Sequence, residues 1–82
     1  MKSLMFSSAI LHRNRVRFLY GLDEITVEPY FITCNQTGKK VVYARVIGSN
    51  EIKMFEYDHI YNIKIIRADR FSPIIPIMPI IN

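Results

Sequence analysis

In its second half the chain reads Lys53-Met54-Phe55-Glu56-Tyr57-Asp58-His59-Ile60, and apolar side chains then alternate through residues 63–66. The first run mixes apolar, aromatic and polar residues in the way that is typical of a half-buried strand. Asp58 opens a brief turn before Ile60, which predicts one turn of 3₁₀ helix over residues 58–62 with the carboxylate accepting free backbone N–H groups. The succession of strand, tight turn and strand indicates a small antiparallel β-structure.

Length and composition favour one domain with one core. The chain has 82 residues, of which 50% are hydrophobic and 22% are charged, so it is not expected to be disordered. Eleven Lys and Arg against seven acidic residues give a net charge of +4. This excess is compatible with binding nucleic acid or an anionic small molecule, and equally with a solvated surface that only confers solubility. Because a core of this size contributes only about a few kcal/mol net, we expect the protein to oligomerise.

The residues that usually carry chemistry are few. Cys34 is the single cysteine, which excludes an internal disulfide and a Cys-rich zinc site and fits a reducing compartment. His12 and His59 lie far from each other and from Cys34, so neither a metal site nor a catalytic thiol is predicted. No uninterrupted apolar run reaches about 18 residues, and the N-terminus lacks the apolar core and cleavage site of a signal peptide. We expect a cytoplasmic protein with no catalytic residue, no cofactor and no membrane association.

The N-terminal twenty residues change their period from helical to extended. Apolar residues spaced by three and four predict a short amphipathic helix over residues 2–12, with Ser3 as its expected N-cap. Residues 13–20 alternate with period two, which predicts a half-buried strand. One face of that strand would carry Arg13, Arg15 and Arg17, and the other Val16, Phe18 and Tyr20.

The rest of the chain predicts four more strands joined by tight turns. They cover residues 25–34, 39–47, 51–57 and 63–68. Pro29 cannot donate to a strand ladder, so it predicts either an edge position or a bulge. The loop Asn35-Gln36-Thr37-Gly38 predicts a hairpin with Gly38 at positive φ. The predicted fold class is mainly β: a small five-stranded antiparallel barrel, SH3-like or Sm-like, formed by residues 1–70 with a short N-terminal helix.

Residues 71–82 form a different kind of segment. They carry no charged side chain, and proline recurs at every third position, at Pro73, Pro76 and Pro79. Proline fixes φ and prevents a helix, so an extended C-terminal arm is predicted. Its isoleucines favour burial, at about 25 cal/mol per Å² of apolar surface. The arm is expected either to wrap its own barrel or to pack on a neighbouring copy in a homo-oligomer.

Several of these segments together resemble the WYL domain of bacterial regulators. The resemblance rests on the predicted helix followed by Arg15-Val16-Arg17-Phe18-Leu19-Tyr20, then Val27-Glu28-Pro29-Tyr30, Gly38-Lys39-Lys40 and Lys53 to Ile60. It covers about residues 9–67. Lys40-Val41-Val42 stands where the family has the tripeptide that names it. Lys53 replaces the arginine of the family's Arg-x-Phe, and Asp58-His59-Ile60 corresponds to its Asp-Arg-Ile.

The resemblance implies both a fold and a role. WYL domains are Sm-like or SH3-like barrels that act as ligand sensors, usually fused to a helix-turn-helix domain. They are thought to bind nucleic acids or nucleotide-like anions through basic and aromatic groups. By this resemblance, Lys53 and His59 stand at positions of ligand contact.

The candidate binding residues are basic or aromatic side chains of the predicted strands. Arginine's planar fork suits phosphate, and tyrosine rings offer stacking faces to bases. Tyr20 and Tyr57 are further candidates for stacking, although each tyrosine could equally be a core residue with its hydroxyl at the surface. The residues expected to bind the ligand are Arg15, Arg17, Tyr43, Arg45, Lys53 and His59.

The sequence leaves two functions open. The first is a non-enzymatic regulatory module that binds an anionic ligand, either single-stranded nucleic acid or a nucleotide, on a basic, tyrosine-bearing strand face. The second is a protein–protein interaction or oligomerisation module that uses the apolar arm of residues 71–82.

Overall fold

The fold was analysed in a computed structural model. It describes the backbone of residues 1–71 and the side chains of residues 1–67 and 71. The predicted arm therefore lies outside the described residues, apart from Phe71. Within the described part of the chain, no helix has the length and apolar character needed to cross a bilayer.

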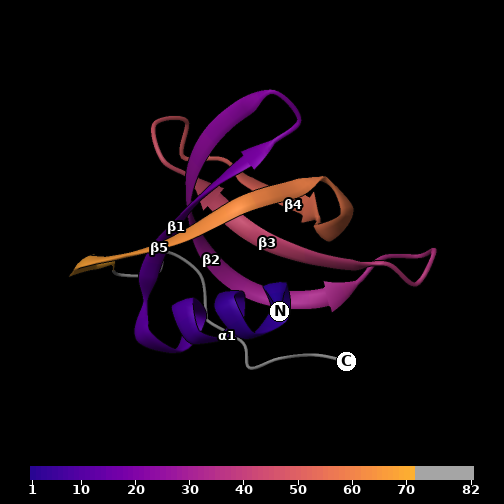
Figure 1. Ribbon diagram of the computed structural model, residues 1–82, viewed down its shortest axis with the longest axis horizontal. Helices are drawn as coiled ribbons and strands as arrows, with labels where there is room; N and C mark the ends of the chain where they lie inside the picture. The colour runs from indigo at the N-terminus through magenta and orange to yellow at the C-terminus, as the bar shows by residue number, and fades with distance from the viewer. Residues whose placement is uncertain (72–82) are drawn as a thin grey trace.

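One helix and five strands make up the fold (Figure 1). The elements are α1 (Lys2–His12), β1 (Asn14–Tyr20), β2 (Asp23–Cys34), β3 (Lys40–Val46), β4 (Ile52–Glu56), the 3₁₀ turn η1 (Tyr57–His59) and β5 (Ile60–Arg70). All strands pair antiparallel in a single sheet of order β4-β3-β2-β1-β5. The predicted mainly-β fold of five antiparallel strands with a short N-terminal helix is confirmed, and the sheet curves around a common interior with α1 beside it.

The two ends of α1 correct two predictions. Arg13 does not continue the strand: it has φ 56°, and its N–H bonds the carbonyls of Ala9 and Ile10, closing the helix in the left-handed conformation. The basic face of β1 therefore begins at Arg15. The N-cap of α1 is Met1 and makes no side-chain hydrogen bond, so Ser3 is not the cap.

Bulges supply part of the curvature of the sheet. The β2–β3 register shifts between Pro29 and Phe31, so the bulge predicted at Pro29 is confirmed, while β2 itself is a central strand. The β1–β5 register shifts between Arg17 and Leu19, close to Asn62, which has φ 54°. A bulge leaves one extra residue unpaired, which shifts the register and bends the strand locally.

The passage from β4 to β5 is shorter than predicted. The 3₁₀ turn lies at residues 57–59, and β5 begins at Ile60. Residues 60–62, which the sequence predicted as part of the turn, belong to β5 and lie next to its bulge. Asp58 makes no capping hydrogen bond, contrary to prediction, and its carboxylate lies 3.3 Å from the Lys39 ammonium. The hairpin between β2 and β3 is as predicted, with Gly38 at φ 83°.

The core lies between α1 and the concave side of the sheet, and aromatic rings dominate it. Phe6 of α1 meets Phe18 edge-to-face at 5.9 Å, and Phe18 meets Phe55 at 5.4 Å. Tyr20 packs edge-on against Phe55 at 5.0 Å. Such rings bury large apolar areas and fix their mutual orientation. The remaining members of this cluster are Ala9, Ile10, Val16, Val27, Ile32, Val42, Ala44 and Ile60.

We expect Phe6→Ala to lower the free energy of unfolding by about 3–5 kcal/mol, because it opens a cavity where α1 meets the sheet. Urea denaturation followed by circular dichroism would measure the loss. Leu4→Ala is the matched control on the same helix, since Leu4 is 64% exposed. Its cost should stay within about 0.5 kcal/mol. Equal losses in the two variants would contradict the assignment of Phe6 to the core.

Candidate functional site

The convex face of the sheet is organised around a buried carboxylate. Glu28 of β2 is fully buried, and it lies directly opposite Arg45 of β3. The Arg45 guanidinium donates from Nε at 2.9 Å and from Nη2 at 2.6 Å to one Glu28 oxygen. Arg15 of β1 donates from Nε at 3.2 Å to the other oxygen. Two predicted ligand residues are therefore brought together, and both are bound to Glu28.

The two arginines are committed to this contact to different extents. The Arg45 side chain is only 18% exposed, and its Nη1 also donates to the Asn50 side chain. The hydrogen bond with Glu28 is the main cause that raises the pKa of Arg45. The Arg15 side chain is 36% exposed and contacts Glu28 through Nε alone. Arg45 is therefore chiefly a structural cation, whereas Arg15 keeps guanidinium surface towards solvent.

Arg17 has a different environment. It is exposed, and it pairs across β1 and β5 with Lys64, which is exposed too. Like charges directly opposite each other in a sheet are destabilising. Neither residue has a carboxylate within ion-pair distance among the described residues. Arg15, Arg17, Arg45 and Lys64 thus place four cations on the convex face, and Arg15 and Arg45 share the one negative charge of Glu28.

Tyr43 lies on the same face, two residues before Arg45 on β3. Its ring stacks on Phe31 at 4.7 Å with an interplanar angle of 19°, and both residues are half-buried. The other two candidate tyrosines are committed elsewhere. Tyr20 packs on Phe55, and its hydroxyl accepts the Glu56 N–H, whereas Tyr57 stacks on Phe6. Of the three candidate tyrosines, Tyr43 alone lies on the face of the arginines, and the buried Tyr30 also interacts with Arg45 and helps to raise its pKa.

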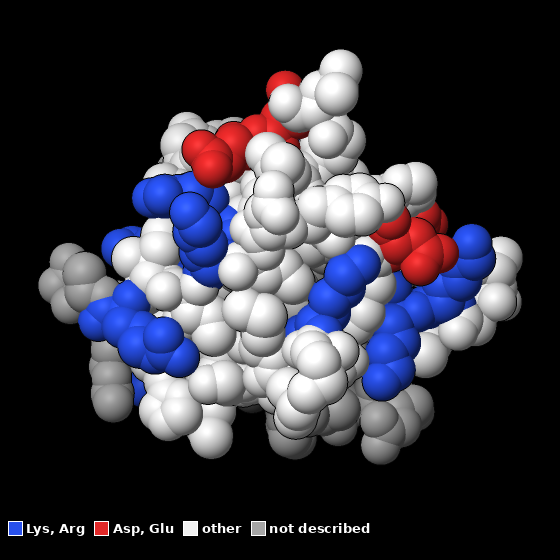
Figure 2. Space-filling model, in the orientation of Figure 1, with Lys and Arg blue, Asp and Glu red and all other residues white. Residues whose placement is uncertain are grey.

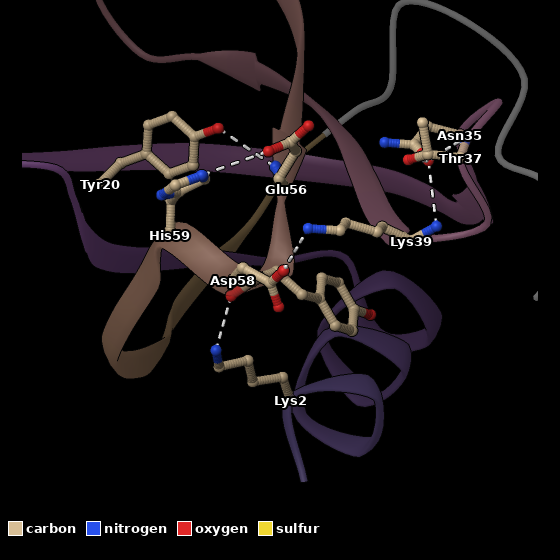
Figure 3. Close-up of polar contacts among 9 residues, drawn as sticks. Lys2, Tyr20, Asn35, Thr37, Lys39, Glu56, Asp58 and His59 are labelled. Carbon is tan, nitrogen blue, oxygen red and sulfur yellow. Dashed lines mark hydrogen bonds and ion pairs between the residues drawn. The ribbon is translucent and has the colours of Figure 1, made fainter.

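Lys53 and His59 lie apart from the arginines. Lys53 pairs with Ala44, and its neighbour Met54 pairs with Tyr43, so Lys53 points away from the convex face. Its ammonium lies 3.9 Å from the Glu51 carboxylate. His59 is on η1, where Nε2 is 3.3 Å from Glu56 and the ring meets Tyr20 at 6.0 Å (Figure 3). Four of the six predicted residues therefore share the convex face, whereas Lys53 and His59 lie elsewhere.

Sequence reasoning missed two residues that shape this surface. Lys64 could have been found from the alternation of Ile63, Lys64 and Ile65. This pattern points the two isoleucines inward and the lysine outward. The sequence gives only a weak indication that Glu28 is important, because it is a single acidic residue between Val27 and Pro29. Its partners depend on strand order. Among the described residues, no three His, Cys, Asp or Glu side chains are grouped as a metal site requires.

The basic side chains are not contiguous on the face of the molecule that Figure 2 shows. On the face shown in Figure 2, Lys and Arg lie in separate groups with uncharged surface between them, and acidic residues border some of these groups. Electrostatic attraction to a polyanion is strongest where cations are contiguous. The neighbouring cations Arg15, Arg17 and Lys64 on β1 and β5 are therefore a better indication of an anion site than the net charge is.

Comparison with known proteins supports the fold. The sequence matches no protein-family model and no curated protein sequence. Among solved structures, the chain is similar to proteasome accessory factor B/C (PafBC) of Arthrobacter aurescens, with a TM-score of 0.76 and 17% sequence identity. The match covers 83% of this chain and 12% of that chain. The chain thus has the fold of one small part of that protein.

We expect Glu28→Gln to lower the free energy of unfolding by about 1–3 kcal/mol, because one amide oxygen cannot accept from both guanidinium groups in a buried position. Chemical denaturation of the folded protein would measure this loss. Glu51→Gln is the matched control: it makes the same chemical change in an exposed pair with Lys53. The control should shift stability by no more than about 0.5 kcal/mol. A Glu28→Gln variant as stable as the control would show that the two contacts with Glu28 contribute nothing net.

Proposed function

We propose that this protein is a non-enzymatic, ligand-binding regulatory module, and that its ligand is a nucleic acid or nucleotide bound on the convex face. The observation that carries the proposal is the Arg17–Lys64 pair, where two exposed cations face each other across adjacent strands. Neighbouring strands lie about 4.8 Å apart, so one phosphate group can contact both side chains. An anion there would relieve the repulsion between them.

Arg15 extends this cationic surface along β1. Residues two apart on a strand point to the same side, so Arg15 and Arg17 present a row that is suited to successive phosphates. Glu28 fixes the position of Arg15 without covering it entirely. The bound carboxylate reduces the cost of ordering the Arg15 side chain when a ligand arrives. Phe31 and Tyr43 add a half-buried aromatic pair on which a base can stack.

Two likenesses support a regulatory role. The sequence resembles WYL domains, which act as ligand sensors, over about residues 9–67, and the fold is similar to that of a part of proteasome accessory factor B/C. By the WYL resemblance, Lys53 and His59 would also contact the ligand. Their separation from the convex face makes the two locations distinguishable by mutation. A cytoplasmic site of action fits the single free cysteine, Cys34.

A second candidate function is oligomerisation or partner binding through residues 71–82. The observation in its favour is the position of Phe71, whose N–H donates to the Arg13 carbonyl. Phe71 is buried, and its ring packs edge-on against the buried Tyr30 at 5.8 Å. This anchors the beginning of the apolar, uncharged segment to the barrel. Packing of that segment on a second copy would give a homo-oligomer.

We expect a fluorescently labelled single-stranded oligonucleotide to bind with a log–log salt slope of about −2, because three cations at about 0.7 each contact phosphates. Arg17→Gln and Lys64→Gln should each reduce the slope by about 0.7 and weaken binding by about tenfold. Fluorescence anisotropy over a salt series would measure both quantities. Neither variant should lose stability, because each removes a like-charge pair.

Lys53→Gln provides the matched control, since it removes the same charge from the opposite side of the sheet. Unchanged affinity in this control would support the convex face. If Lys53→Gln weakens binding and Arg17→Gln does not, the ligand lies on the side that the WYL resemblance implies. Binding that is indifferent to salt and lost on deletion of residues 72–82 would favour the interaction module.

A further inference from the structure

A shallow pocket opens where the start of α1 meets η1 and the hairpin between β2 and β3. Its volume is about 560 Å³, and its lining includes Lys2, Ser3, Lys40, Tyr57 and Asp58. On the right of Figure 2, basic side chains gather over this part of the molecule beside an acidic group. None of the six residues expected from the sequence to bind the ligand lines the pocket, although Tyr57, a further candidate for stacking, does.

Two ammonium groups in the pocket wall have no carboxylate partner among the described residues. The Lys2 ammonium donates to the Tyr57 carbonyl at 2.6 Å and lies 5.4 Å from the centre of the Tyr61 ring. The Lys40 ammonium donates to the Ser3 hydroxyl at the long distance of 3.4 Å. Each group therefore keeps donor capacity, since an ammonium carries three N–H donors.

The one carboxylate of the lining is already engaged. Asp58 lies 3.3 Å from Lys39, and Figure 3 shows Lys2 and Lys39 approaching η1 from different sides. The negative charge of Asp58 is balanced by Lys39, so it does not neutralise the positive charges of Lys2 and Lys40. Two cations held around one concave surface repel each other, and a bound anion would remove that repulsion.

One hydroxyl group, that of Tyr57, completes a set of donors suited to an oxyanion. The Ser3 hydroxyl donates to the Tyr57 hydroxyl at 3.2 Å, so the proton of Tyr57 can be donated to a ligand oxygen. Burial raises the pKa of Tyr57, outweighing the opposing effect of the Ser3 hydrogen bond, and the phenol stays protonated at neutral pH. Its ring adds an apolar wall beside the cations.

The elements that carry these groups are held in place by local contacts. The Asn35 side-chain oxygen accepts the backbone N–H groups of Thr37 and Lys39, which fixes the hairpin that presents Lys40 (Figure 3). Tyr57 is stacked on Phe6 of α1, which fixes η1 against the helix. Preorganised donors bind an anion at a lower entropic cost than mobile ones.

We propose that this pocket is a second anion site, distinct from the convex face, and that it binds the phosphate group of a phosphate monoester. Lys2 and Lys40 would contribute charge, and Tyr57 would donate a neutral hydrogen bond. The volume suits a ligand of mononucleotide size, because pockets for small molecules measure about 300–1,000 Å³. Asp58 disfavours ligands with additional negative charge next to η1.

The test titrates the full chain with adenosine monophosphate, adenosine and inorganic phosphate while amide ¹H–¹⁵N shifts are recorded. We expect the monophosphate and inorganic phosphate to shift the amides of residues 2–4 and 57–58, and adenosine to shift none of them. Lys2→Gln/Lys40→Gln should weaken binding of the monophosphate by at least about tenfold, since charged hydrogen bonds contribute about 1.5–3 kcal/mol each. Lys40→Gln alone should also weaken binding, and it leaves the Lys2 contact with η1 intact.

The control is Arg17→Gln/Lys64→Gln, which removes the same charge from the convex face. Measured at the amides of residues 2–4 and 57–58, this variant should bind the monophosphate as tightly as the natural sequence, even where binding at the convex face falls. The proposal for the pocket and the proposal for the convex face can thus be rejected independently of each other. Shifts confined to other amides, equal binding of adenosine, or unchanged binding by both lysine variants would overturn the pocket assignment.

Discussion

The arrangement of the convex face depends on one buried carboxylate, Glu28. A carboxylate removed from water is costly unless its oxygens accept well-placed hydrogen bonds. Here Arg15 and Arg45 approach from the two neighbouring strands and occupy both oxygens. The contact therefore ties β1, β2 and β3 together at one level and sets the positions of two guanidinium groups. It also divides the cations into those that stabilise the sheet and those, such as Arg17 and Lys64, that remain available to a ligand.

The parts of the fold that follow from local patterns were predictable. The alternation of arginines with Val16 and Phe18 predicted β1, and Asn35 to Gly38 predicted the hairpin, because side-chain parity and turn chemistry act over a few residues. Element ends were less predictable. Arg13 takes the left-handed conformation that closes α1, although its spacing from Arg15 and Arg17 fits a strand equally well. The competition between helix cap and strand start is decided by the docking of α1 on the core.

The candidate site was predictable in composition and not in arrangement. Basic residues on β1 and β3 were expected, but the role of Glu28 depends on β2 lying between those two strands, which no local pattern specifies. Likewise, Lys53 and Tyr43 were grouped as ligand residues, yet the β3–β4 register pairs Tyr43 with Met54 and turns Lys53 to the other side. A register change of one residue would reverse this assignment. The predicted role of residues 71–82 lies outside the described residues, apart from Phe71.

The two proposed anion sites differ in the physical origin of their shape. On the convex face, strand spacing and parity place Arg15, Arg17 and Lys64 at regular intervals on an open surface, an arrangement suited to a repeating polyanion or an extended ligand. At the start of α1, three elements meet around a concavity, and Lys2 and Lys40 reach it from different elements. Such convergence suits a compact anion, whose single phosphate can contact both ammonium groups at once. The strands thus provide the extended surface and the junction of elements provides a shallow concave one, so under these proposals a polymer and a small molecule would bind at different places on the module.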